Sequence, residues 1–230
     1  MKIKIKIFPD DESRLRQRIE AAARQGAEAV RVWFDFSVDE LEIEVYGSRQ
    51  QWIEEHTRLN QEELATWVAG DSGRIIRVVA TGSEAHLLRM VAHECVHHIL
   101  HRHVASLPAW LDEGIAMHLL FTMPQHYRQE LEQAVRHNAL LPFDLLAKSF
   151  AVLGRGLKDL AYAQSWAMVE HIGNRYGSRM LKELLLALGR GESLDMALRP
   201  WGTNMYLLEG EMCRCYSGQC SMSNEQFAHG

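Results

Sequence analysis

Two hydrophobic periodicities divide the first 82 residues into predicted strands and helices. Apolar and polar residues alternate in "KIKIKIF" at 2–8, "AVRVWFDFS" at 29–37 and "ELEIEVYG" at 40–47. Alternation puts every second side chain on the same face of a sheet, so these stretches predict strands. The apolar run "RIIRVVATG" predicts a further strand that ends at Gly82.

Other stretches carry apolar residues at helical spacing. "DESRLRQRIEAAARQG" predicts an amphipathic helix closed by Gly26, because glycine tolerates the backbone that ends a helix. The stretch at 48–70 is also predicted to be mainly helical. After Gly82 helix follows helix, with predicted spans of about 83–103, 109–121, 124–138, 160–176 and 178–189 and a helix stop at Gly177.

This order of elements predicts an α+β fold. Residues 1–82 would form an α+β N-terminal part, and residues 83–212 a helical part. Residues 213–230 are polar and small, which favours a mobile tail. The tail holds Cys213, Cys215 and Cys220, whose thiolates are an alternative set of ligands for a second metal.

Composition narrows the classes of function. The chain has 230 residues and a formal net charge of -5, and it contains no Lys/Arg-rich block. We therefore expect no nucleic-acid partner and no attraction to anionic membranes. The N-terminal alternation differs from the apolar core of a signal peptide, and no stretch approaches the roughly 18 apolar residues of a membrane span. The expected location is the cytoplasm.

The candidate metal-binding and catalytic residues cluster in "MVAHECVHHILHRH" at 90–103, within the first predicted helix after Gly82. His93, Glu94 and His97 form the pattern H-E-x-x-H. On a helix, positions i and i+4 share one face, so both imidazoles can reach one Zn²⁺. Glu94 can instead take a proton from the attacking water.

A catalytic zinc site usually has three protein ligands, and two residues compete for the third place. His103 completes a spacing that resembles the metzincin pattern, but Leu100 stands where metzincins have glycine. With leucine there, the helix should continue and direct His103 elsewhere. Glu113, in "LPAWLDEGIAMHL", lies about one turn inside the next helix and is the favoured ligand. Its neighbour Asp112 is expected to point away.

Three stretches in this order resemble the peptidase-MA-like gluzincin domains: "VAHECVHHIL", "LPAWLDEGIA" and "AYAQSWAMVEHIGNRYG". The resemblance extends over residues 45–212. It implies a zincin-like fold, a Zn²⁺ cofactor on His93, His97 and Glu113, and Glu94 as the catalytic base. It also implies a peptide or protein substrate, and it suggests that "RIIRVVA" is the edge strand of the sheet beside the active-site cleft.

Related aminopeptidases use a tyrosine from a later helix to stabilise the oxyanion, which makes Tyr162 a second catalytic candidate. Ser165 and His171 on the same predicted helix are its rivals, and the alternative for Tyr162 is a core residue with a satisfied hydroxyl. Cys95 is expected to be a buried, small apolar residue.

The sequence thus predicts a zinc metallopeptidase of the gluzincin type, in which a zinc-activated water hydrolyses peptide bonds. Two alternatives stay open. One is a non-catalytic zinc-binding module of the same fold that recognises or regulates a partner, and the other is a hydrolase of non-peptide amides.

Overall fold

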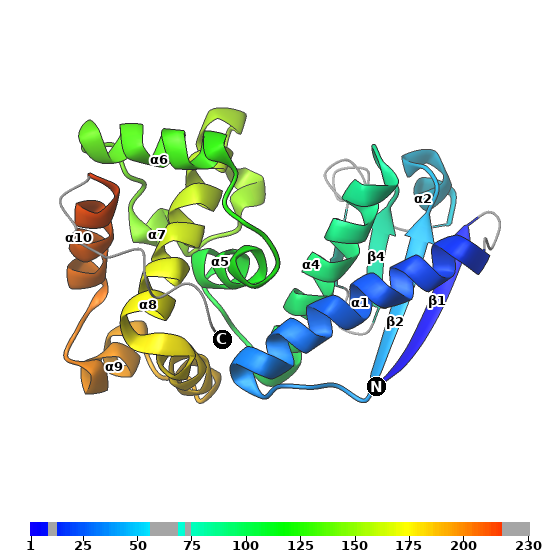
Figure 1. Ribbon diagram of the computed structural model, residues 1–230, viewed down its shortest axis with the longest axis horizontal. Coiled ribbons are helices and arrows are strands. Elements are labelled where there is room, and N and C mark those ends of the chain that lie inside the picture. Colours follow the sequence, from blue (N-terminus) through cyan, green and yellow to red (C-terminus); the bar gives the residue numbers. More distant parts are fainter. Residues whose placement is uncertain (9–12, 56–68, 72–74, 218–230) are drawn as a thin grey trace. The chain divides into compact units, whose positions relative to one another are not determined.

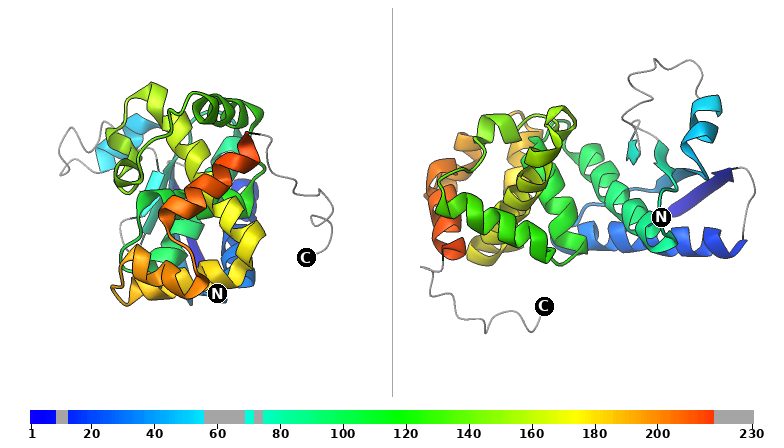
Figure 2. Two further views of the ribbon diagram at one scale, coloured as in Figure 1. Left: turned by 90° about the vertical axis from the view of Figure 1, so that its left-hand side faces the viewer. Right: turned by 90° about the horizontal axis from the view of Figure 1, so that it is seen from above.

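The computed structural model describes residues 1–8, 13–55, 69–71 and 75–217 (Figures 1 and 2). The chain divides into two compact units. The first contains Met1–Leu107 and Leu119–Phe121, and the second contains Pro108–His118 and the chain from Thr122 onward. The boundary falls inside helix α5 (Ala109–Leu120), which therefore contributes residues to both units.

The first unit is built on a four-stranded mixed sheet. Strands β1 (Lys2–Phe8), β2 (Glu40–Tyr46) and β4 (Ile75–Val79) are parallel neighbours, and β3 (Ala69–Asp71) pairs antiparallel with β4, which gives the order β1-β2-β4-β3. Parallel neighbours need a crossover, and helix α1 (Ser13–Phe34) supplies it between β1 and β2. The predicted α+β class and the strands at 2–8 and 40–47 are confirmed.

Helices α1 and α4 (Glu84–His103) pack against one face of this sheet (Figure 1). The alternating strands turn their apolar side chains to the helices, and the resulting core is fully or almost fully buried. It includes Ile5, Ile19, Ala23, Leu41, Ile43, Val45, Ile76, Val78, Leu87, Val91 and Cys95. The short helix α2 (Arg49–Glu55) adds Trp52 to a smaller cluster with Tyr46 and Val79.

The predicted strand at 29–37 is wrong, and so is the predicted helix end at Gly26. Helix α1 continues through both to Phe34. Its buried residues Ile19, Ala22, Ala23, Gly26, Val30 and Phe34 are spaced by one, three or four, which is the spacing of one helix face. Gly26 marks close packing instead, because a Cβ there would lie 2.4 Å from the backbone oxygen of Ala92 on α4.

The expectation that residues 74–80 form the edge strand is also wrong. Strand β4 pairs with β2 on one side and with β3 on the other, so β3 lies at that edge. Only three residues of β3 pair with β4, which is too short a stretch to stand out as a strand by periodicity. The predicted helix at 48–70 begins as α2, and its part at 56–68 lies outside the described residues.

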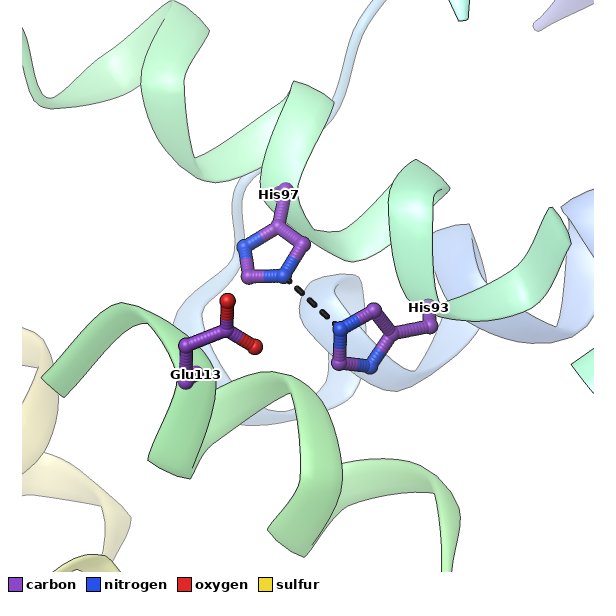
Figure 3. Close-up of side chains that lie close together, drawn as sticks. All are labelled: His93, His97 and Glu113. Carbon is purple, nitrogen blue, oxygen red and sulfur yellow. Dashed lines mark hydrogen bonds between the residues drawn. The ribbon is translucent and has the colours of Figure 1, made fainter. Parts of the chain in front are cut away.

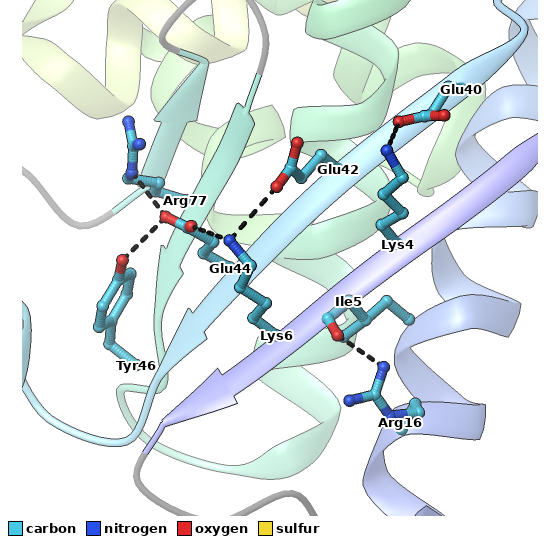
Figure 4. A network of polar contacts seen from close by, with 9 residues as sticks. All are labelled: Lys4, Ile5, Lys6, Arg16, Glu40, Glu42, Glu44, Tyr46 and Arg77. Carbon is cyan, nitrogen blue, oxygen red and sulfur yellow. Dashed lines mark hydrogen bonds and ion pairs between the residues drawn. The ribbon is translucent and has the colours of Figure 1, made fainter.

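The other face of the sheet carries charged side chains in complementary rows (Figure 4). Lys4 pairs with Glu40, and Lys6 lies near Glu42 and Glu44. The Glu44 carboxylate is almost buried and accepts hydrogen bonds from the Tyr46 hydroxyl (2.9 Å) and Arg77 Nε (2.9 Å). These contacts hold β1, β2 and β4 together on this face of the sheet.

In the described part of the second unit, every regular element is a helix. After α5 come α6 (Gln125–Arg136), α7 (Phe143–Leu146), η1 (Phe150–Val152), α8 (Arg155–Gly189), α9 (Leu194–Leu198), η2 (Arg199–Trp201) and α10 (Met205–Tyr216). The predicted break at Gly177 is confirmed, because its φ of 80° interrupts the helical backbone of α8. The first segment of α8 begins at Arg155, earlier than the predicted residue 160.

Helix α10 extends past residue 212, where the tail was predicted to begin, and includes Cys213 and Cys215. Its end is held by the Tyr216 hydroxyl, which donates a hydrogen bond to Glu170 on α8 (2.9 Å). A second link joins His171 to Glu211 (3.0 Å). Cys220 lies outside the described residues, and none of the described helices is long and apolar enough to cross a membrane.

The contact at Gly26 predicts that Gly26→Ala lowers the free energy of unfolding by about 1–3 kcal/mol, the usual cost of overpacking. The added methyl would meet backbone, which cannot rotate away. Gly156→Ala is the matched control, since a Cβ there meets nothing within 4 Å. Urea denaturation of both variants measures the difference, and equal stabilities would contradict the contact.

Glu44 predicts an acid-sensitive contribution to stability. Burial raises the pKa of its carboxyl, but hydrogen bonds from Tyr46, Lys6 and Arg77 outweigh burial and hold the pKa below its usual range. A lowered folded-state pKa stabilises the fold above the unfolded-state pKa of about 4.3, and this contribution is lost as the pH falls.

We therefore expect Glu44→Gln to destabilise the fold at pH 7 and to differ less from wild type near pH 3.5. Urea denaturation at both pH values tests this. Glu28→Gln removes an exposed carboxylate that pairs with Arg31 on the same helix, and it should change stability little. A Glu44→Gln effect that is independent of pH would show that the charge of Glu44 is unimportant.

Candidate metal centre

Helix α4 presents His93 and His97 one turn apart. The helix starts at the N-cap Ser83, whose side chain accepts a hydrogen bond from the His86 backbone, and it runs unbroken to His103. The Nε2 atoms of His93 and His97 lie 2.9 Å apart, so both point to one place. His97 is 7% exposed and His93 is half-buried.

The rest of α4 explains why these histidines are held in place. Leu87, Val91 and Cys95 are buried in the core of the first unit. Cys95 is fully buried, which confirms its predicted role as a small apolar residue. Because this face is fixed by packing, the histidine face keeps one orientation, and Glu94 is held half-buried between the two faces.

Helix α5 carries Glu113 and packs closely on α8 beside this residue. Next to Glu113, a Cβ on Gly114 would lie 2.5 Å from the backbone oxygen of Ser165, so α5 approaches α8 closely. This contact holds the backbone of α5 in place beside Glu113.

The ligand atoms of His93, His97 and Glu113 lie within 4.8 Å of one another (Figure 3). Two imidazole nitrogens and one carboxylate oxygen are a donor set of catalytic zinc sites, so these residues fit Zn²⁺. A second group in the described part of the chain shares His97 and adds His101 and Asp112. The expectation that Asp112 points away is therefore wrong.

His103 has other contacts. Its ring stacks on Phe36 with centroids 4.4 Å apart, and its Nε2 lies 2.9 Å from the backbone oxygen of Ser37. The prediction that α4 continues past Leu100 and directs His103 elsewhere is confirmed.

The three candidates on α8 differ in their surroundings. The Ser165 hydroxyl donates to the Ala161 backbone oxygen (2.7 Å) and is fully buried. His171 contacts Glu211 on α10. Both side chains thus serve the packing of α8. Tyr162 is half-buried and has aromatic neighbours, Tyr127 and Phe150.

Tyr127 on α6 is a residue near this region that the sequence did not identify. Burial raises the pKa of its phenol, as do the nearby carboxylates of Asp159 and Glu113. The only sequence signal was a tyrosine on the apolar face of an amphipathic helix, which is also typical of an ordinary core position.

The sequence matches a known protein family. The sequence model of the peptidase MA superfamily matches residues 37–210. The matched range contains His93, Glu94, His97, Glu113 and Tyr162. None of the curated proteins matches the chain.

The ligand assignment predicts that Glu113→Ala loses most of the zinc bound per chain, whereas His103→Ala keeps it. His103 is the matched control because it stacks on Phe36 and contacts Ser37. Metal analysis of the purified variants measures both. Equal zinc content in Glu113→Ala and wild type would exclude Glu113 as a ligand.

Proposed function

The chain belongs to the peptidase MA superfamily, and from this premise we propose that it is a zinc-dependent peptidase of the gluzincin type. The observation that carries the proposal is the group formed by His93, His97 and Glu113, which combines the chemistry and the spacing of a zinc site. The range matched by the superfamily model, residues 37–210, includes these three residues, which supports the proposal.

Zn²⁺ held by these residues would lower the pKa of a water and polarise the scissile carbonyl. The protein's own part is to hold the ligands and to move the proton. Packing of α4 keeps both imidazoles directed to one point, and the contact at Gly114 seats α5 on α8 beside Glu113. Such preorganisation is what a catalytic site requires of its supporting shell.

Glu94 is the proposed general base. It follows His93 directly, so it cannot comfortably share the coordination of the two histidines, and it is half-buried on α4. Its carboxylate takes a proton from the attacking water as the new C–O bond forms. It then delivers that proton to the amine nitrogen as the C–N bond breaks, which returns Glu94 to its carboxylate form.

Tyr162 is the proposed second donor to the carbonyl oxygen, which gains negative charge as water attacks. We also propose that the first unit has a zincin-like arrangement. Supporting this are the parallel strands with one antiparallel edge strand, β3, and the position of the H-E-x-x-H motif on the helix that packs against the sheet.

The proposed substrate is a peptide or protein. Measuring the amines released from mixed peptides and from small amides distinguishes this proposal from the amide hydrolase and the non-catalytic module. Each substrate is tested with and without a chelator. Zinc-dependent release from peptides supports the proposal. Release only from small amides favours the amide hydrolase, and zinc binding without any hydrolysis favours the non-catalytic module.

Glu94→Gln should keep its zinc and lose at least about 10²-fold in hydrolysis rate, the scale of a lost general base. Glutamine keeps the size and shape of the side chain but cannot accept the proton. Glu84→Gln on the exposed first turn of α4 is the matched control and should hydrolyse at the wild-type rate. Wild-type turnover by Glu94→Gln would rule out Glu94 as the base.

A further inference from the structure

The ring of Tyr162 is bounded on two sides by aromatic side chains. Tyr127 on α6 lies nearly parallel to it, with ring planes 5° apart and centroids 6.5 Å apart. Phe150 meets it edge to face, with planes 83° apart and centroids 5.3 Å apart. Offset-stacked and edge-to-face pairs at these distances are attractive geometries, so both neighbours restrict the rotation of the Tyr162 ring.

Helix α6 fixes the position of Tyr127. Tyr127 lies four residues before Leu131 and seven before Ala134, and these two residues are the buried ones on α6. Residues at this spacing share one face of a helix, so Tyr127 lies on the face that packs inward. Its ring is half-buried and is therefore partly enclosed by the second unit.

Burial and the charges of carboxylates both act on the Tyr127 hydroxyl. Burial, Asp159, Glu113 and Glu130, in that order, raise the pKa of its phenol. Asp159 lies three residues before Tyr162, on the same turn of α8. The Tyr127 phenol thus stays protonated, and its ring stands between α6 and the part of α8 that carries Tyr162.

We infer that Tyr127 is a positioning residue, whose ring holds the Tyr162 ring in the orientation that directs its hydroxyl to the substrate carbonyl. This inference rests on the proposed function. A donor must be held within about 0.5 Å of its productive position, and a misplacement of about 1 Å can cost up to 10²-fold in rate. Because the ring does the positioning, the Tyr127 hydroxyl is dispensable.

Kinetics of single and double variants test this dependence. Tyr127→Phe keeps the ring and should retain kcat within about twofold. Tyr127→Ala should lower kcat by about tenfold, within the range for a misplaced catalytic group, with KM and zinc content unchanged. In the Tyr162→Phe background, Tyr127→Ala should have no further effect on kcat, because the donor that it positions is already absent.

Two kinetic outcomes would overturn the inference. If Tyr127→Ala lowers kcat equally in the wild-type and the Tyr162→Phe backgrounds, Tyr127 acts independently of Tyr162. If Tyr127→Phe and Tyr127→Ala lower kcat equally, the hydroxyl of Tyr127 matters rather than its ring. Tyr206→Ala, which removes an 82% exposed tyrosine of the same unit, is the control and should leave kcat unchanged.

A readout without activity separates this inference from the proposed function. With ¹³Cζ-labelled tyrosine, the NMR resonance of Tyr162 reports its surroundings in the zinc-free protein. Tyr127→Ala, or Tyr127→Leu if the alanine variant does not fold, should shift or broaden this resonance, whereas Tyr206→Ala should not. An unchanged resonance overturns the inference, and a wild type that lacks zinc-dependent hydrolysis overturns only the proposed function.

Discussion

The structure depends on two close helix contacts, each made possible by a glycine and each adjacent to a candidate ligand. Gly26 on α1 lets the backbone of Ala92 approach, and Ala92 immediately precedes His93. Gly114 lets α5 approach Ser165 on α8, and it immediately follows Glu113. Backbone cannot move aside as a side chain can, so each contact fixes the helix at the turn where a ligand projects.

The first contact also explains how α4 can carry so many imidazoles. Burying a polar side chain costs free energy unless it is bonded, whereas each fully buried Leu or Val contributes about 1.5–3 kcal/mol. Leu87, Val91 and Ile99 are buried on the same helix as His97 and His98. Packing of α4 against α1 and the sheet thus offsets the cost of holding histidines in a largely buried position.

Features encoded within a few residues could be predicted from the sequence. The H-E-x-x-H spacing places His93 and His97 together on any helix, and Leu100 decides whether that helix continues to His103. Features that depend on a distant partner could not. The alternation at 29–37 suggested a strand, but the buried residues from Ile19 to Phe34 share one helix face, and α1 packs closely on α4 at Gly26. Tertiary packing thus overrode the local pattern.

The same distinction explains what was missed around the candidate site. Asp112 is next to Glu113 in the sequence, and its grouping with His97 and His101 joins residues of two helices, which local spacing does not specify. Tyr127 is 35 positions before Tyr162, and only the contact of α6 with α8 brings their rings together. Two ligands on one helix can thus be predicted from their spacing in the sequence. The residues that support them can be identified only from the fold, because each contacts a neighbour that is distant in the sequence.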